Sequence, residues 1–134
     1  MNIKELIKIH EGLKLKPYLC SAGKLTIGYG RNLDDRGITK HEAETMLDTD
    51  IAQAQQDLFQ IFGHQVDALS VNRYAALVDM MFNLGLTRFR GFKKMIEAIK
   101  QNDWKETHRQ ALDSKWAEQV KTRSTRDAIL LLEG

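Results

Sequence analysis

The sequence of 134 residues contains one cysteine and one proline. A single cysteine excludes an intramolecular disulfide and any zinc site built from several thiolates. One proline and nine glycines leave no room for a long disordered linker, and repeats and low-complexity runs are absent. A chain of this length suits one compact domain, or two small lobes that share a long element.

Long apolar runs are also missing, so no stable insertion into a membrane is expected. The first residues, MNIKELIKIHEG, are charged throughout and do not resemble a signal peptide. We therefore expect synthesis in the cytoplasm. The four histidines lack the HExxH spacing of zinc hydrolases, so we predict neither a metal site nor a cofactor.

The net charge is small: the sequence has 20 Lys and Arg and 18 Asp and Glu, which gives +2. The basic residues are scattered, and no aromatic-rich basic stripe suggests base stacking, so a nucleic-acid partner is not expected. A slight basic excess is compatible with an anionic polymer such as cell wall. No long exposed apolar stripe is evident, which favours a monomer.

Helical periodicity dominates the sequence. Asn2 and Glu5 form a capping box for a helix that ends at Glu11, where Gly12 can adopt a left-handed C-cap. Further capping residues predict two longer helices, 40–62 and 71–84, the second apolar on most faces. In the first of these, the residues expected to face inward are Ala43, Met46, Leu47, Ile51, Ala54 and Leu58. We also expect a polar turn over 31–37, a tight connection over 85–91, shorter helical pieces over 92–99, after Asp103 and over 116–120, and a last helix capped by Ser124 with Asp127.

The stretch 10–30, HEGLKLKPYLCSAGKLTIGYG, changes from helical to alternating periodicity within about ten residues. It predicts two short strands, 16–20 and 25–29, joined by a turn over 21–24. Three reactive side chains lie in it, namely Glu11, Cys20 nine positions later, and Thr26 six positions after that. A carboxylate is thus placed where a helix gives way to a hairpin.

These residues resemble the signature of the T-even type phage lysozymes, which are muramidases. That family has Glu, then usually Asp (Cys in some phage relatives), then Thr at the same spacings. EGLKLKPY and TIGYG agree with it in one register. The resemblance continues through Arg73-Tyr74-Ala75-Ala76-Leu77, Phe82-Asn83-Leu84-Gly85 and Ser114-Lys115-Trp116, and it departs in a shorter segment after Gly30 and an end soon after Leu132.

The resemblance implies an α+β, mainly α, lysozyme-like fold within a single domain, 1–134. A small β-containing lobe over about 12–38 and a larger helical lobe, 1–11 and 63–134, would surround a cleft. The helix over about 39–62 would connect them as a spine, since about twenty residues span roughly 30 Å.

Cleavage of a glycosidic bond needs a proton for the leaving oxygen and a negative or nucleophilic group on the other face of the sugar. The resemblance assigns Glu11 as the acid and Thr26 as the residue that holds the attacking water. Cys20 is open to three interpretations: a thiolate nucleophile, a base for that water, or an inert small apolar side chain. We favour the second, with inversion at the anomeric carbon.

Further site residues are implied by the resemblance alone. Arg123 resembles the arginine that pairs with the catalytic glutamate and orients it. Phe82 matches an aromatic residue that faces the cleft, and Gln110 matches an amide presented to the sugar, although it is one methylene longer. Asn32 occupies a sugar-contact position that is usually apolar.

The predicted function is hydrolysis of the β-1,4 bond between N-acetylmuramic acid and N-acetylglucosamine in peptidoglycan, with cell lysis as the result. The protein would be made in the host cytoplasm and reach periplasmic peptidoglycan after a holin-type lesion. The alternative is a catalytically inactive module of the same fold that binds peptidoglycan or belongs to a phage tail. The residues by themselves indicate a carboxylate-dependent hydrolase.

Overall fold

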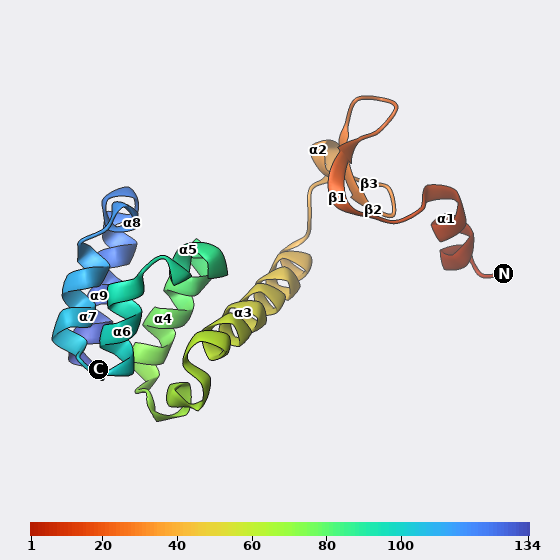
Figure 1. Cartoon of the computed structure of the whole chain (residues 1–134). Coiled ribbons are helices and arrows are strands. Elements are labelled where there is room, and N and C mark those ends of the chain that lie inside the picture. The colour runs from red at the N-terminus through yellow and green to blue at the C-terminus, as the bar shows by residue number, and fades with distance from the viewer. The chain divides into compact units, whose positions relative to one another are not determined.

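The computed structural model describes residues 1–134, which divide into two compact units, 1–46 and 47–134 (Figure 1). The first unit holds α1 (Ile3–Glu11), β1 (Lys14–Leu19), β2 (Leu25–Gly28), β3 (Arg31–Asn32), α2 (Leu33–Arg36) and the beginning of α3 (Lys40–Phe62). The second holds the rest of α3, the 3-10 helix η1 (Gly63–Ala68), α4 (Val71–Leu84), α5 (Leu86–Arg90), α6 (Lys93–Lys100), α7 (Trp104–Leu112), α8 (Lys115–Gln119) and α9 (Lys121–Glu133). The predicted α+β, mainly helical class is confirmed. No helix combines the length and the apolar character needed to cross a membrane.

The sheet of the first unit is an antiparallel meander with β2 in the centre. Thr26 of β2 faces Tyr18 on one side and Asn32 on the other. The pairing of β1 is irregular between Lys14 and Tyr18, and Pro17 lies in this part of the edge strand, where a missing N–H is tolerated. The predicted hairpin is therefore confirmed, with strand ends that differ by one or two residues.

The segment after Gly30 was expected to be only a polar turn, and that prediction is wrong. It forms β3 and the short helix α2. The Asn32 side chain accepts a hydrogen bond from the Asp35 N–H at 3.0 Å and so caps α2. A local cap therefore allows one helical turn where the composition indicated none.

The start of α3 is fixed to β3 by a bidentate ion pair. Arg31 Nη1 and Nη2 donate to Glu42 Oε1 at 3.0 Å and Oε2 at 2.6 Å. The guanidinium, together with the Thr39 N–H, lowers the pKa of Glu42 to about 2. Thr39 and Glu42 also form a capping box at the start of α3.

Along α3, Ala54 and Leu58 are buried as predicted and Ile51 is partly buried, but Ala43 is exposed. Met46 and Leu47 are exposed as well. The buried cluster of the second unit reaches α3 only from Ala54 onward, which leaves these two apolar side chains outside it. The boundary between the units falls between these two residues, inside α3. The lobe boundaries, the assignment of α1 to the helical lobe and the cleft stay predictions.

The second unit has its core on α4, where Leu77, Met80 and Met81 are fully buried. The helices α6, α7 and α9 pack around it (Figure 1). The rest of the core comes from other elements of the unit and includes Leu58, Phe89, Met95, Ile99, Ala111, Trp116, Ala128 and Leu131. The connection expected over 85–91 contains a helix, α5, whose Phe89 enters the core. This burial explains a helical turn that the glycines at both ends did not indicate.

The predicted cap of the last helix is wrong. α9 begins at Lys121 without a side-chain cap, and Ser124 and Asp127 both lie inside the helix and are buried. The Ser124 hydroxyl lies within hydrogen-bonding distance of the carbonyl oxygens of Lys121 at 3.1 Å and Ala117 at 3.3 Å, and Asp127 packs against α4.

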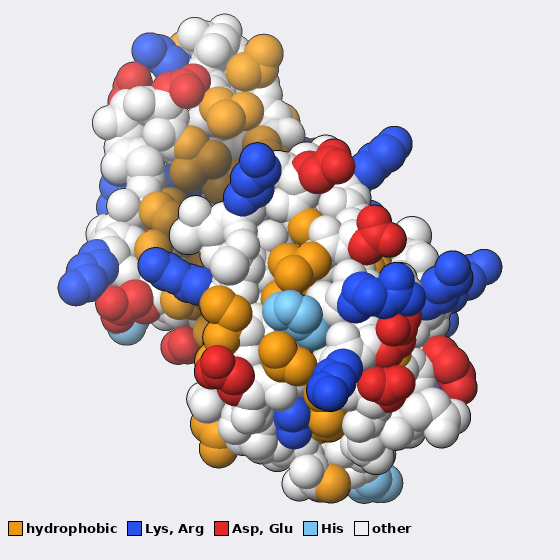
Figure 2. All heavy atoms as spheres, turned by 90° about the vertical axis from the view of Figure 1, so that its left-hand side faces the viewer, with side chains coloured by type: hydrophobic (Ala, Val, Ile, Leu, Met, Phe, Trp, Pro, Cys, Tyr) orange, Lys and Arg blue, Asp and Glu red, His pale blue; other side chains and the backbone are white.

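On the face that Figure 2 draws, basic and acidic side chains are interspersed, in keeping with the small net charge.

Candidate active site

Glu11 is the last residue of α1, and its side chain lies against Gly30. A Cβ added to Gly30 would come within 2.5 Å of Glu11 Oε2 and 2.8 Å of Cδ. Gly30 also has a φ of +78°, a region that other residues rarely adopt. The second glycine of TIGYG therefore lets the carboxyl group approach the backbone directly.

Cys20 follows β1, at the start of the turn that leads into β2. Its N–H donates to the Lys24 carbonyl at 2.9 Å, and its own carbonyl accepts from the Gly23 N–H at 2.8 Å. The N–H groups of Lys24 and Ala22, and to a lesser degree the Thr26 hydroxyl, lower the pKa of the Cys20 thiol against the opposing effect of burial. The turn therefore favours the thiolate form.

Thr26 pairs with Tyr18, lies diagonally across the hairpin from Cys20, and is 3% exposed. Its hydroxyl donates to the Lys24 carbonyl at 2.9 Å and is also within reach of the Cys20 sulfur. One hydroxyl hydrogen serves one acceptor at a time, whereas the oxygen lone pairs can accept from a water. The structure thus brings Cys20 and Thr26 together, with Glu11 at the other end of the same hairpin.

Asn32 lies beside Thr26 in the sheet, but its polar atoms are engaged elsewhere. Its Nδ2 donates to Asp35 Oδ2 at 3.0 Å, and its Oδ1 accepts from the Asp35 N–H. Its contact with a sugar stays a prediction.

In the second unit, Phe82 and Arg123 line one pocket of about 440 Å³ between α3, α4 and α9. The guanidinium carbon lies 5.9 Å from the centre of the Phe82 ring. Arg123 Nε and Nη2 donate to the carboxylate of Asp79 at 2.9 and 2.6 Å. Within its unit, Asp79 is therefore the partner of Arg123, and the predicted pairing with Glu11 stays a prediction.

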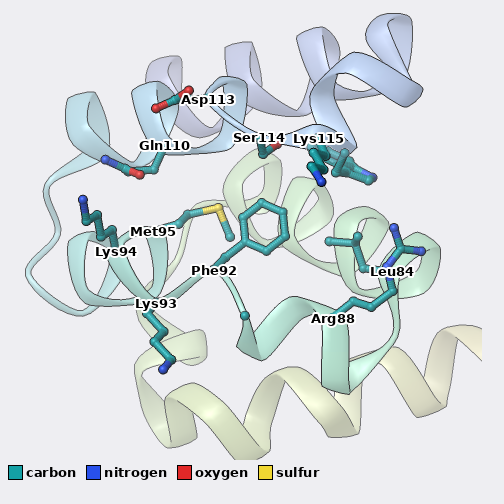
Figure 3. A pocket seen from close by; sticks show the side chains of 12 residues that line it. Leu84, Arg88, Phe92, Lys93, Lys94, Met95, Gln110, Asp113, Ser114 and Lys115 are labelled. Atoms are coloured by element: carbon teal, nitrogen blue, oxygen red, sulfur yellow. The ribbon is translucent and has the colours of Figure 1, made fainter.

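Gln110 lines a different pocket of the same unit, about 580 Å³ in volume (Figure 3). The pocket is lined by Leu84, Phe92 and Met95 on its apolar side and by cationic side chains that include Arg88, Lys94 and Lys115. The Gln110 amide donates to Glu106 Oε1 at 2.8 Å. Phe82 and Gln110 thus belong to separate pockets.

The sequence does not reveal the roles of three residues: Gly30, Asp79 and Asp127, the last of which it indicated only as a cap. The two aspartates carry a detectable signal, because Asp79 interrupts an apolar run on α4 and Asp127 follows Arg123 by one helical turn. The close approach at Gly30 depends on tertiary structure.

No group of three or more His, Cys, Asp or Glu side chains could hold a metal ion.

Comparison with known proteins matches residues 8–127 to the phage lysozyme family. An endolysin of Acyrthosiphon pisum secondary endosymbiont phage 1 is 42% identical over 98 residues, which is 66% of this chain and 64% of the endolysin. The pre-baseplate central spike protein of Enterobacteria phage T4 is 27% identical over the whole of this chain, which corresponds to 28% of the spike protein. A probable T4-type lysozyme of Dictyostelium discoideum is 26% identical over 93% of this chain and 90% of its own length. The chain thus spans less than two thirds of the endolysin and of the spike protein.

Proposed function

Because the chain belongs to the phage lysozyme family, we propose that it is a peptidoglycan hydrolase that cleaves the β-1,4 bond between N-acetylmuramic acid and N-acetylglucosamine. The observation that carries this proposal is that the first unit places Glu11 of α1 against Gly30, which follows β2, and the Cys20 thiol beside the Thr26 hydroxyl. A carboxyl group and a second ionisable group are what glycoside hydrolysis requires.

In the proposed reaction, Glu11 donates its proton to the glycosidic oxygen as the bond to the anomeric carbon breaks. Thr26 holds a water through an oxygen lone pair, and the Cys20 thiolate accepts a proton from that water as it attacks. The N–H groups around Cys20 lower the pKa of the thiol and so favour the thiolate that this step needs.

The remaining predicted residues complete the proposal. Asn32, Phe82 and Gln110 contact substrate, and Arg123 orients the acid. The similarity to an endolysin supports lysis as the biological role. In this role, the protein would be synthesised in the host cytoplasm and reach the periplasm through a holin-type lesion. We also propose that the protein acts as a monomer.

A turbidity assay on Gram-negative cells stripped of their outer membrane tests the proposal. We expect clearing, together with release of reducing ends that carry N-acetylmuramic acid. Binding to isolated sacculi without clearing would overturn the enzymatic proposal in favour of an inactive binding module.

A further inference from the structure

Three charged side chains meet where α4 packs on α9: Asp79, Arg123 and Asp127. Arg123 uses Nε and Nη2 for the two oxygens of Asp79, and Nη2 also lies 3.4 Å from the Asp79 carbonyl. This bidentate arrangement fixes one edge of the planar guanidinium. Within the unit, Nη1 has no hydrogen-bond partner, so the opposite edge is available at the pocket that Phe82 lines.

Asp127 lies behind this pair and is 4% exposed. Its Oδ2 is fully buried and receives no hydrogen bond. Its side chain interacts with the carboxyl group of Asp79, which itself has no proton donor to offer when ionised. The Asp79 side chain is 38% exposed, whereas the Asp127 carboxyl group beside it is buried. Two adjacent carboxylates beside one guanidinium would leave a negative charge that Arg123 does not compensate, which favours a proton on one of them.

The proton belongs to Asp127. Burial, reinforced by the neighbouring Asp79 carboxylate, raises the pKa of Asp127 to about 8. Burial acts in the same direction on Asp79, but hydrogen bonds from Arg123 and Asp127 outweigh it and lower the pKa of Asp79. The charges that act on Asp127 are those of Asp79 on α4 and Arg123 on α9, while His108 of α7 bonds the carbonyl of the next residue, Ala128, at 2.9 Å.

We propose that Asp79 and Asp127 are positioning residues that act through Arg123, with the Asp127 acid group donating a hydrogen bond to Asp79 and Asp79 holding the guanidinium. This inference rests on the proposed function in one respect, because it assigns the held arginine to the catalytic site. The arrangement itself is a property of the second unit.

The pH dependence follows from the direction of each shift. The folded protein keeps a proton on Asp127 that the unfolded chain releases above about pH 4. The stabilisation is complete below that pH and is lost as the pH rises to about 8. Above pH 8 the ionised Asp127 repels Asp79 and competes for Arg123, so the position of the guanidinium becomes less well defined.

The first experiment needs no activity. Carboxyl ¹³C NMR should show Asp127 titrating near pH 8 in the parent protein, and the Arg123 Nε–H signal should shift over the same range. In Asp127→Asn, whose amide is a permanent donor, the Arg123 signal should stay constant and the decrease in melting temperature between pH 5 and pH 8 should be smaller. Glu133→Gln, at an exposed position of α9, serves as the control.

The second experiment measures peptidoglycan clearing from pH 5 to pH 9.5. Asp79→Asn should lower kcat by up to about 100-fold with a smaller change in KM. The reason is that an arginine no longer held in place stabilises the transition state less, while substrate binding changes little. Asp127→Asn should retain activity and extend it to higher pH. An Asp127 signal that titrates near pH 4, or an Arg123 signal that ignores both substitutions, overturns the inference. Absence of clearing by the parent would instead overturn the proposed function.

Discussion

At the scale of single residues, one substitution tests whether Glu11, which contacts Gly30, is the general acid. Glu11→Gln keeps the shape of the side chain and removes the proton that the leaving oxygen requires. Loss of a general acid typically lowers the rate about 10²–10⁴-fold. The fold should not change, because Glu11 is exposed and its side chain has no hydrogen-bond partner within its own unit. Clearing rates with circular dichroism as the fold check test this prediction.

The matched control is Glu44→Gln, which removes an exposed carboxylate from the same unit. It should clear peptidoglycan at the parent rate. If Glu11→Gln remained within a few fold of the parent, Glu11 would not be the acid.

Cys20 gives a second prediction at this scale. Cys20→Asp should retain substantial activity, because it replaces a thiolate with the negative group that the family usually has there. Cys20→Ala should lose most of the activity. A thiol reagent should inactivate the parent, and bound chitooligosaccharide should slow that inactivation if the thiol lies near the sugar.

Full activity of Cys20→Ala would contradict both active roles of the thiol and leave it as an apolar side chain. Lysis after treatment with the thiol reagent, at an unchanged rate, would lead to the same conclusion. The lowered pKa of the thiol beside the Lys24 and Ala22 N–H groups is compatible with an active role.

The catalytic candidates could be predicted from the sequence because their chemistry is local. Cys20 and Thr26 belong to one hairpin, so their proximity follows from strand spacing and a turn signal. The neighbours that define their environment could not be predicted in the same way. Asp127 was interpreted as a cap residue, since Ser-x-x-Asp is a local pattern, and only the packing of α9 on α4 shows it to be buried.

At the scale of elements, α4 determines the stability of the second unit. Leu77 has no exposed surface, and truncation of a fully buried leucine to alanine costs about 2–5 kcal/mol. We therefore expect Leu77→Ala to lower the melting temperature clearly while leaving the activity of the folded protein intact. Urea unfolding monitored by tryptophan fluorescence is the measurement, since Trp104 and Trp116 both belong to this unit.

Val71→Ala is the control on the same helix, because Val71 is 85% exposed. A surface substitution of this kind usually changes the free energy of unfolding by no more than about 0.5 kcal/mol. Equal unfolding midpoints for the two variants would show that α4 is not the core helix.

The long helices were predictable with their ends, whereas the short helices α2 and α5 were not. The bounds of α3 and α4 agree with the prediction because each begins at a capping residue and continues with a long apolar pattern. α2 and α5 each have five residues or fewer, too few for periodicity to be recognised. They form because Asn32 caps one and Phe89 of the other is buried, and only the first of these is visible in the sequence.

At the scale of the whole molecule, the predicted roles divide between the two units. Glu11, Cys20 and Thr26, which are assigned to bond cleavage, belong to the first unit, and Phe82, Gln110 and Arg123 belong to the second. In the proposed mechanism, the groups that break the bond therefore come from α1 and the small sheet, and the larger helical unit would contribute recognition and the positioning of one cation.

The outcome of the complete reaction is the stereochemistry of the new reducing end, and it distinguishes the two active roles of Cys20. A thiolate that attacks the anomeric carbon forms a glycosyl-thiol intermediate, and a second displacement by water then gives overall retention. A thiolate that takes a proton from water held by Thr26 gives a single displacement and inversion. We predict inversion, because the Thr26 hydroxyl lies beside the Cys20 sulfur and offers a place for that water.

Proton NMR of a soluble peptidoglycan fragment, recorded before mutarotation, should show the α-anomer first. An initial β-anomer, or a protein mass increased by one glycosyl unit and lost in Cys20→Asp, would instead identify the thiol as the nucleophile.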